Sequence, residues 1–404
     1  MNGDALAPIG ILLLVACLIA IVTRRFGWPY SVGLAAAGAG IAYLPNAPQL
    51  PLSRDLIFNI FLPPLVFEAA LKLDWKPFRR ELPVTLVLAF LGVAIAAAVV
   101  AGGMHWLVGW SWIGAALFAV LIAATDPVSV IASFRELKVE PRLSMLVESE
   151  SLLNDGVVAV IFSVLIAVVA GGASSPGAVA TSFLWTLCGG VLIGAISGAA
   201  VLLIAGKTDD HLVEISLTTI AAYGSFLMAE HFHASGVLAS LTAGLVIGNL
   251  GLTGAISHHG RQHLLDTWDY FAFLANSFVF MLIGMNVATS PVGLLGFATA
   301  GIAVVLVLLG RTAAVYPLCA IFFRSKLAVP ARYQHILVWG GLRGALGLAL
   351  ALTLPPIPER VAIILTTFVV VAFSLFVQGL TMSGLVRRLG IDCGVDAKEE
   401  RCRA

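Results

Sequence analysis

The chain has 404 residues, of which 60% are hydrophobic and 11% are charged, and its formal net charge is +1. Ordinary soluble chains contain about 45–50% apolar residues, so a soluble globular protein could not bury this much apolar surface in one core. The composition excludes a soluble globular protein. It indicates a protein that lies in lipid, for which we expect no nucleic-acid partner.

The first apolar run extends from Leu6 to Val22, and it is followed by Arg24 and Arg25. No basic residue precedes it, whereas a cleavable signal peptide carries its positive charge in front of the apolar run. We therefore expect this run to be a retained first transmembrane helix with its N-terminus outside.

Thirteen apolar runs along the chain have the length that a transmembrane helix requires, about 20 residues. Turn-forming segments such as Pro45-Asn46-Ala47-Pro48 and Pro355-Pro356-Ile357-Pro358 separate several of them. We predict an all-α polytopic membrane protein of thirteen transmembrane helices. The predicted spans are 6–23, 28–45, 53–71, 82–103, 111–133, 147–170, 180–205, 211–229, 235–251, 264–288, 292–322, 331–353 and 360–386.

Basic residues are distributed unequally between the two sides of this topology. Of the 23 lysines and arginines, 19 fall in segments that are cytoplasmic when the N-terminus is outside, and only Arg54 and Arg360 fall in external loops. Because cytoplasmic loops are enriched in Lys and Arg, we predict a cell inner-membrane protein with its N-terminus outside and a short cytoplasmic tail at 387–404. The two remaining basic residues, Arg311 and Arg343, lie inside predicted spans.

The fifth predicted span contains Thr125-Asp126-Pro127 near its middle. Proline lacks an N–H and disfavours helix in the residue before it, so we expect the helix to break at Asp126-Pro127. Transporters use such breaks at mid-membrane, where free carbonyls and half-helix ends line ion sites. A charged residue at this depth costs at least about 2.5–3.5 kcal/mol on insertion scales, which favours a functional role for Asp126 over a simple kink.

The sixth predicted span opens with a polar stripe. Glu150 and Asn154 are four residues apart, as are Ser151 and Asp155, so each pair lies on one face of a helix. Helix capping explains serine and acidic residues in a first turn, but Asn154 and Asp155 lie further into the span. Carboxylate, hydroxyl and carbonyl oxygens suit alkali and alkaline-earth cations, and one or two carboxylates fit a monovalent ion.

The two arginines inside predicted spans need partners. Arg311 cannot deprotonate, and we expect a buried ion pair between it and Glu150. Arg343 lies in a run with four glycines in eight residues, which indicates a second broken or closely packed helix in the twelfth span. Its guanidinium has two candidate roles: it compensates the helix end at the Asp126 break, or it pairs with Glu68 on the third span.

These motifs together resemble the electroneutral sodium/proton exchanger branch of the monovalent cation:proton antiporters. The resemblance rests on Thr125-Asp126-Pro127, on Glu150-Ser151-Leu152-Leu153-Asn154-Asp155 and on Gly341-Leu342-Arg343-Gly344-Ala345, in that order along the chain. Phe67-Glu68-Ala69-Ala70 and Gly310-Arg311 also resemble family positions. The resemblance implies that Asp155, Asp126, Ser151 and the Thr125 carbonyl bind the ion. It implies that Asn154, Glu150 and Arg311 hold the site, and we count Arg343 and Glu68 among the supporting residues.

The resemblance also implies an architecture. It consists of inverted six-helix repeats, spans 1–6 and 8–13, in which the broken spans 5 and 12 cross near the midplane. Scaffold helices at about 6–71 and 211–288 are expected to form a homodimer. Core helices at about 82–170 and 292–386 are expected to move against this scaffold, and a linker helix at about 180–205 joins the two parts.

From these residues we predict a secondary transporter rather than an enzyme, with no cofactor. Na⁺ (or Li⁺) and H⁺ compete for Asp155 and exchange by alternating access, because the loaded site is neutral whereas the empty, charged site is blocked from crossing. Asn154 rather than a second acid precedes Asp155, and no lysine lies in the spans, so we predict electroneutral one-for-one exchange. The alternatives are a K⁺/H⁺ antiporter and, with less support, a cation channel. An intramembrane hydrolase that uses Asp155 and Asp126 is disfavoured, because no catalytic motif framed by glycines accompanies them.

Overall fold

The computed structural model describes residues 6–26, 29–44, 56–171, 175–208, 210–251, 254, 256–289 and 294–391. These residues form α-helices with short π-helical stretches, and no β-strand is found among them. In this part of the chain, 7 helical segments are long and apolar enough to cross a membrane, and further apolar helices are shorter. The prediction of an all-helical membrane protein is confirmed, whereas the number of thirteen spans stays a prediction. The predicted turn at 45–48, the external Arg54 and residues 392–404 of the predicted tail lie outside the described residues.

The chain divides into two compact units. The first unit contains residues 1–52, 81–154 and 277–404, and the second contains residues 53–80 and 155–276. Three helices pass from one unit to the other: α4 (Trp75–Val87), α8 (Pro141–Val169) and α12 (His258–Thr289). The assignment of helices to a scaffold, a core and a linker stays a prediction.

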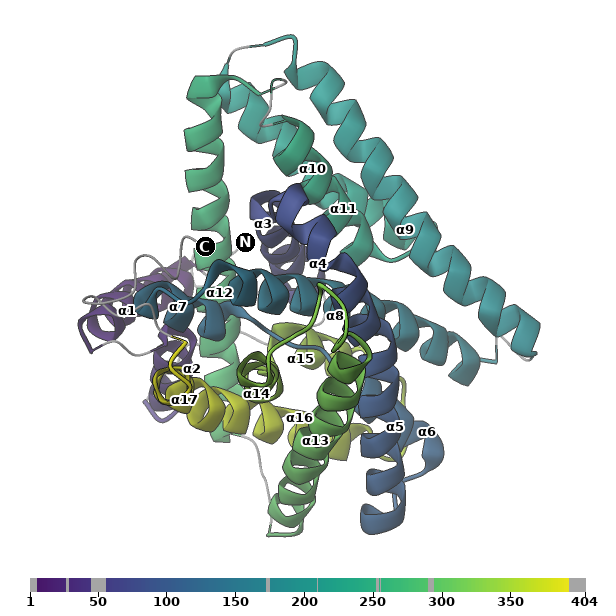
Figure 1. The fold of residues 1–404 in the computed structure, drawn as a ribbon. Helices are drawn as coiled ribbons and strands as arrows, with labels where there is room; N and C mark the ends of the chain where they lie inside the picture. The colour runs from purple at the N-terminus through teal and green to yellow at the C-terminus, as the bar shows by residue number, and fades with distance from the viewer. Residues whose placement is uncertain are drawn as a thin grey trace. The chain divides into compact units, whose positions relative to one another are not determined.

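The first unit contains most of the helices. Its π-helical stretches at Leu88–Gly92 and Met104–Val108 extend α5 at both ends, and a third at Ser374–Gly379 joins α16 to α17. α5 and α13 run side by side (Figure 1), and Leu306 of α13 lies directly against Gly103 of α5. Besides α4, α8 and α12, which it shares with the second unit, the helices of this unit are α1 (Leu6–Phe26), α2 (Tyr30–Ile41), α5 (Val93–Gly103), α6 (Trp112–Leu121), α7 (Val128–Leu137), α13 (Leu294–Ile321), α14 (Ala331–Trp339), α15 (Ala345–Leu352), α16 (Arg360–Phe373) and α17 (Leu380–Arg388).

Two spans of the first unit are interrupted where the sequence predicts breaks. The chain is not helical between α6 and α7, where Asp126 and Pro127 lie. It is also not helical between α14 and α15, at Gly340–Gly344. Both predicted breaks are therefore confirmed. The proline has no N–H with which to continue a helix, and glycine is the weakest helix former after proline.

The second unit is built from α3 (Leu62–Lys72), α9 (Pro176–Ala205), α10 (His211–His231) and α11 (Gly236–Leu250), with a π-helical stretch at Leu56–Phe61 before α3. α9, α10 and α11 lie together (Figure 1). Gly194 of α9 lies against the backbone of Ala239, and Gly248 of α11 lies against the backbone of Leu71. Small residues at helix interfaces let helices in lipid approach closely.

Gly194→Ala is expected to destabilise the second unit, because a Cβ at this position would overlap the backbone of Ala239. Overpacking of this kind typically costs about 1–3 kcal/mol. Gly224→Ala on α10 is the matched control, since a Cβ there meets only Ile220 Cγ2 at 3.8 Å and alanine is the better helix former. Thermal melting of the purified protein should give a lower Tm for Gly194→Ala alone. An unchanged Tm would contradict the close approach of α9 and α11.

Candidate functional site

The break between α6 and α7 leaves backbone carbonyls without helical partners. Thr125 is buried at this break, and Asp126 is half-buried. Asp126 Oδ1 accepts a hydrogen bond from Val128 N at 2.9 Å, so its side chain satisfies the N–H of the first residue of α7. The carbonyls of Ala123, Ala124 and Thr125 are left to be satisfied by other segments.

Side chains of α8 bind directly to this break. Ser151 Oγ donates to the Thr125 carbonyl, and the two hydroxyl oxygens lie 3.1 Å apart. Asn154 Nδ2 donates to the Ala123 carbonyl at 3.1 Å and to Thr125 Oγ1 at 3.0 Å. Ser151 and Asn154 are both buried, so these two residues of the polar stripe face the break rather than lipid.

Asn154 has one further polar atom at this place. Its Oδ1 is buried, and no described residue donates a hydrogen bond to it. A buried acceptor without a donor is costly. An oxygen of this kind, beside the Thr125 and Ser151 hydroxyls, suits the hard oxygen coordination that alkali cations prefer.

The second break supplies positive charge to the first. Arg343 Nη1 donates to the carbonyls of Ala123 at 2.7 Å and Ala124 at 3.2 Å. Asp126 N donates to the Leu342 carbonyl at 2.7 Å, so the backbones of the two breaks are hydrogen-bonded to each other. A side chain at Gly344 would overlap that of Asp126. The arrangement matches the first of the two roles predicted for Arg343, compensation of the helix end.

Glu68 is bound within the second unit. Its Oε1 lies 2.6 Å from Lys72 Nζ, one turn further along α3. Lys72 also pairs with Asp269. The spacing of four residues between Glu68 and Lys72 is typical of ion pairs on one helix, and it could have predicted this pair.

The predicted buried ion pair beside the site is present. Arg311 Nη1 and Nη2 donate to the two carboxylate oxygens of Glu150 at 2.7 and 2.8 Å. Arg311 Nε also donates to the Leu337 carbonyl at 3.1 Å, near the end of α14. The pair therefore links α8, α13 and α14, and it lies beside Thr125, Pro127 and Ser151 around the same small pocket.

Asp155 follows Asn154 on α8 and is half-buried. It lies four residues after Ser151, so the two side chains project from the same face of the helix. Asp155 belongs to the second unit, and its place beside Asp126 and Thr125 stays a prediction. Within the described segments, no group of three or more His, Cys, Asp and Glu side chains gathers as it would around a tightly held metal.

The sequence did not single out two polar residues of the thirteenth predicted span. Ser374 Oγ accepts a hydrogen bond from Arg343 N at 3.1 Å, and Gln378 Nε2 donates to the Trp339 carbonyl at 2.9 Å. Both side chains therefore bind the ends of the second break. The signal that could have found them is a serine and a glutamine four residues apart in an otherwise apolar segment.

Ser374→Ala is expected to lower the stability of the first unit, since it removes the acceptor of the buried Arg343 N–H. Loss of one partner of a buried hydrogen bond costs about 1–3 kcal/mol. Ser163→Ala is the matched control, because among the described residues this exposed hydroxyl binds the carbonyl of Ala159 on its own helix and no other group. A drop in Tm for Ser374→Ala and none for Ser163→Ala is the expected result. Equal Tm values would contradict a supporting role for Ser374.

Comparison with known proteins identifies the family. The family model described as "Sodium/hydrogen exchanger, transmembrane" matches residues 11–388. The Na⁺/H⁺ antiporter ApNhaP of Aphanothece halophytica is 37% identical over 90% of this chain and 70% of its own length. The Na⁺/H⁺ antiporter NhaH of Halobacillus aidingensis is 33% identical over 97% of this chain and 100% of its own length.

A solved structure has the same fold. The sodium proton antiporter MjNhaP1 of Methanocaldococcus jannaschii superposes with a TM-score of 0.76, covering 95% of this chain and 98% of that one at 19% identity. The family match over most of the chain and the two broken helices agree with the resemblance seen in the sequence. The chain is a membrane transporter that belongs to the sodium/hydrogen exchanger family.

Proposed function

We propose that this protein exchanges Na⁺, or Li⁺, for H⁺ across the cell inner membrane. The observation that carries the proposal is that the second helix break and the side chains of Ser151 and Asn154 all bind the first break, at residues 123–125, within the first unit. The relatives named as Na⁺/H⁺ antiporters support the choice of ions. The N-terminus lies outside and the C-terminal tail is cytoplasmic, as the distribution of basic residues favours.

The ion binds at Asp155, Asp126, Ser151 and Thr125. Ser151 and Thr125 offer neutral oxygens, and the two carboxylates supply negative charge. A carboxylate holds either a proton or a cation, so H⁺ and Na⁺ compete for Asp155. Asp155 is neutral with either ion bound, and the loaded site crosses between the inward-facing and outward-facing states, whereas the site with an empty, charged Asp155 does not.

The exchange is electroneutral, one Na⁺ for one H⁺. Asn154 is neutral and is already bound to the Ala123 carbonyl. Asn154 rather than a second acid precedes Asp155, and no lysine lies in the predicted spans. The charge of Arg343 is directed at carbonyls and that of Arg311 at Glu150, so Asp155 is the group that exchanges its proton for Na⁺. The charge that enters with one ion therefore leaves with the other.

The architecture that serves this cycle is an inverted repeat of spans 1–6 and 8–13 within thirteen spans. The core helices at about 82–170 and 292–386 move against the scaffold helices at about 6–71 and 211–288, which form the homodimer. The linker helix at about 180–205 joins them. Rigid movement of one bundle against another around a fixed site is the usual route to alternating access.

The proposal is tested with the purified protein in liposomes that carry a pH gradient. Addition of Na⁺ or Li⁺ is expected to dissipate the pH gradient. The rate should be the same whether or not K⁺ and valinomycin clamp the transmembrane voltage. Dependence on the clamp would contradict electroneutral exchange. A response to K⁺ alone would favour the K⁺/H⁺ antiporter, and conduction of cations without proton movement would favour the channel.

A further inference from the structure

A second polar network links α8 to α14 at the end of these helices that is predicted to be cytoplasmic. It consists of Glu81, Glu140, Arg142, Arg332 and Tyr333, and we call it the helix-end network. Resting on the exchange function proposed above, we propose that the helix-end network sets the position of α8 relative to α14 and thereby the affinity of the site for its cation.

Arg142 is the centre of the first half of this network. It lies in the first turn of α8, and its Nε and Nη2 donate to the two carboxylate oxygens of Glu81 on α4 at 2.9 and 3.1 Å. Glu81 is buried, so the paired geometry compensates a charge that would be costly alone. Arg142 also donates to the carbonyls of Ala328 at 3.1 Å and Leu327 at 3.2 Å, in the segment before α14.

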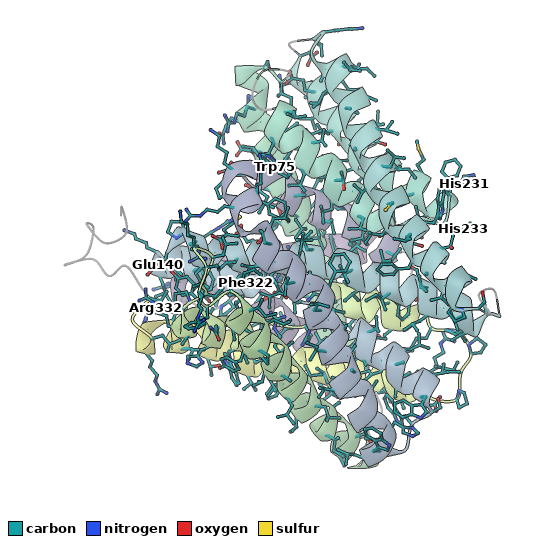
Figure 2. The ribbon with its side chains drawn as sticks, turned by 45° about the vertical axis from the view of Figure 1, so that its right-hand side comes forward. Trp75, Glu140, His231, His233, Phe322 and Arg332 are labelled. Atoms are coloured by element: carbon teal, nitrogen blue, oxygen red, sulfur yellow. The ribbon has the colours of Figure 1, made fainter. Side chains whose placement is uncertain are left out.

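Glu140 forms the second half, immediately before α8. Its Oε1 accepts a hydrogen bond from Arg332 Nη2 at 3.1 Å, and its Oε2 accepts one from the Tyr333 hydroxyl. Arg332 and Tyr333 both lie in the first turn of α14. Figure 2 shows Glu140 and Arg332 next to each other in the first unit. The start of α8 is therefore bound to the start of α14 on both sides of Pro141.

The Glu150–Arg311 pair is the other polar link between these helices. Arg311 binds Glu150 on α8 and the Leu337 carbonyl on α14. Glu150 lies eight residues after Arg142, which corresponds to about 12 Å along a helix. Leu143 and Leu146 of α8 pack in one apolar cluster with Ile336 of α14, and two polar links at different heights fix the direction of α8 against α14 more firmly than one.

The direction of α8 matters for the cation more than for the proton. Ser151 and Asn154 follow Glu150 within about one helical turn, and both bind the break at Thr125. α14 leads into the second break, whose Arg343 binds the carbonyls of the first. A dehydrated cation requires several oxygens at defined distances, whereas a proton requires one carboxylate. Tilting of α8 against α14 therefore weakens cation binding first.

The test uses the full-length protein in liposomes and compares three variants. Glu81→Gln/Arg142→Gln removes both charges of the buried pair, so neither is left uncompensated, and Glu140→Gln weakens the link to Arg332 and Tyr333. Lys326→Gln is the control, because this lysine is exposed in the same segment and no described contact involves its side chain. The readouts are the Na⁺ concentration for half-maximal exchange, the maximal rate, the pH of half-maximal exchange and the Tm.

The expected result is a rise of about three- to tenfold in the Na⁺ concentration for half-maximal exchange in the first two variants, with a maximal rate within about twofold of the wild type. Their pH of half-maximal exchange should move to a higher value, because the proton competes better, and Lys326→Gln should match the wild type. The inference is overturned if half-saturation and the pH profile stay unchanged, or if only the maximal rate and the Tm fall. Absence of exchange in the wild type would instead refute the proposed function on which the inference rests.

Discussion

Replacing Asp155 with Asn is expected to abolish exchange while the protein still folds. Asn has nearly the shape of Asp, but it neither carries the negative charge that attracts a cation nor binds and releases a proton near neutral pH. Asp155 is half-buried on α8, and the similar shape of Asn lets the helix keep its packing. Cation-triggered release of a pH gradient in liposomes should fall to the level of liposomes without protein.

The control for this variant is Asp74→Asn. Asp74 is an exposed acid of the second unit, for which the described structure shows no side-chain contact, so its loss changes the net charge equally without touching the site. Size-exclusion profiles and Tm values of both variants should match the wild type. Exchange at the full wild-type rate in Asp155→Asn would refute the assignment of Asp155 as the shared site for the two ions.

Breaking the Glu150–Arg311 pair is expected to have the largest effect on stability. Both side chains are buried, at 2% and 8% exposure, and they are joined by two hydrogen bonds. Removal of one partner leaves the other charge buried, which costs about 3–5 kcal/mol. Glu150→Gln and Arg311→Gln should therefore each lower the Tm strongly.

The double variant distinguishes an ion pair from two independent contributions. Glu150→Gln/Arg311→Gln contains no uncompensated charge, so its loss of stability should be clearly smaller than the sum of the two single losses. Arg332→Gln provides a comparison at the more exposed Glu140–Arg332 pair, where the loss should not exceed about 1 kcal/mol. Additive losses in the Glu150 and Arg311 variants would show that the two side chains do not depend on each other.

Much of this site could be predicted from the sequence, because its strongest signals are local. A proline after an acid at the centre of an apolar span breaks the helix whatever surrounds it, and the break at Asp126-Pro127 is present. A buried arginine requires a partner. Glu150 offered the suitable acid, and the pair is present.

The contacts that the sequence could not determine are those that depend on how distant segments fold together. The partner of Arg343 was open between a helix end and Glu68, and only the folded backbone brings its guanidinium to the Ala123 carbonyl. A carbonyl acceptor has no signature in the sequence. Arg142 likewise counted only as a basic residue of a cytoplasmic loop, since nothing in its own segment indicates Glu81, 61 residues away along the chain.

The central claim is that H⁺ and Na⁺ compete for one site, and the dependence of the Na⁺ half-saturation on pH tests it most directly. Exchange should be measured over a range of Na⁺ concentrations at several pH values, with equal pH on both sides and ²²Na⁺ as the tracer. If the ions compete, the half-saturating Na⁺ concentration should rise by about tenfold for each unit by which the pH falls at the acidic end of the range, and the maximal rate should stay unchanged. A constant half-saturating concentration with a maximal rate that falls as pH falls would contradict competition, because it would place the proton at a separate site.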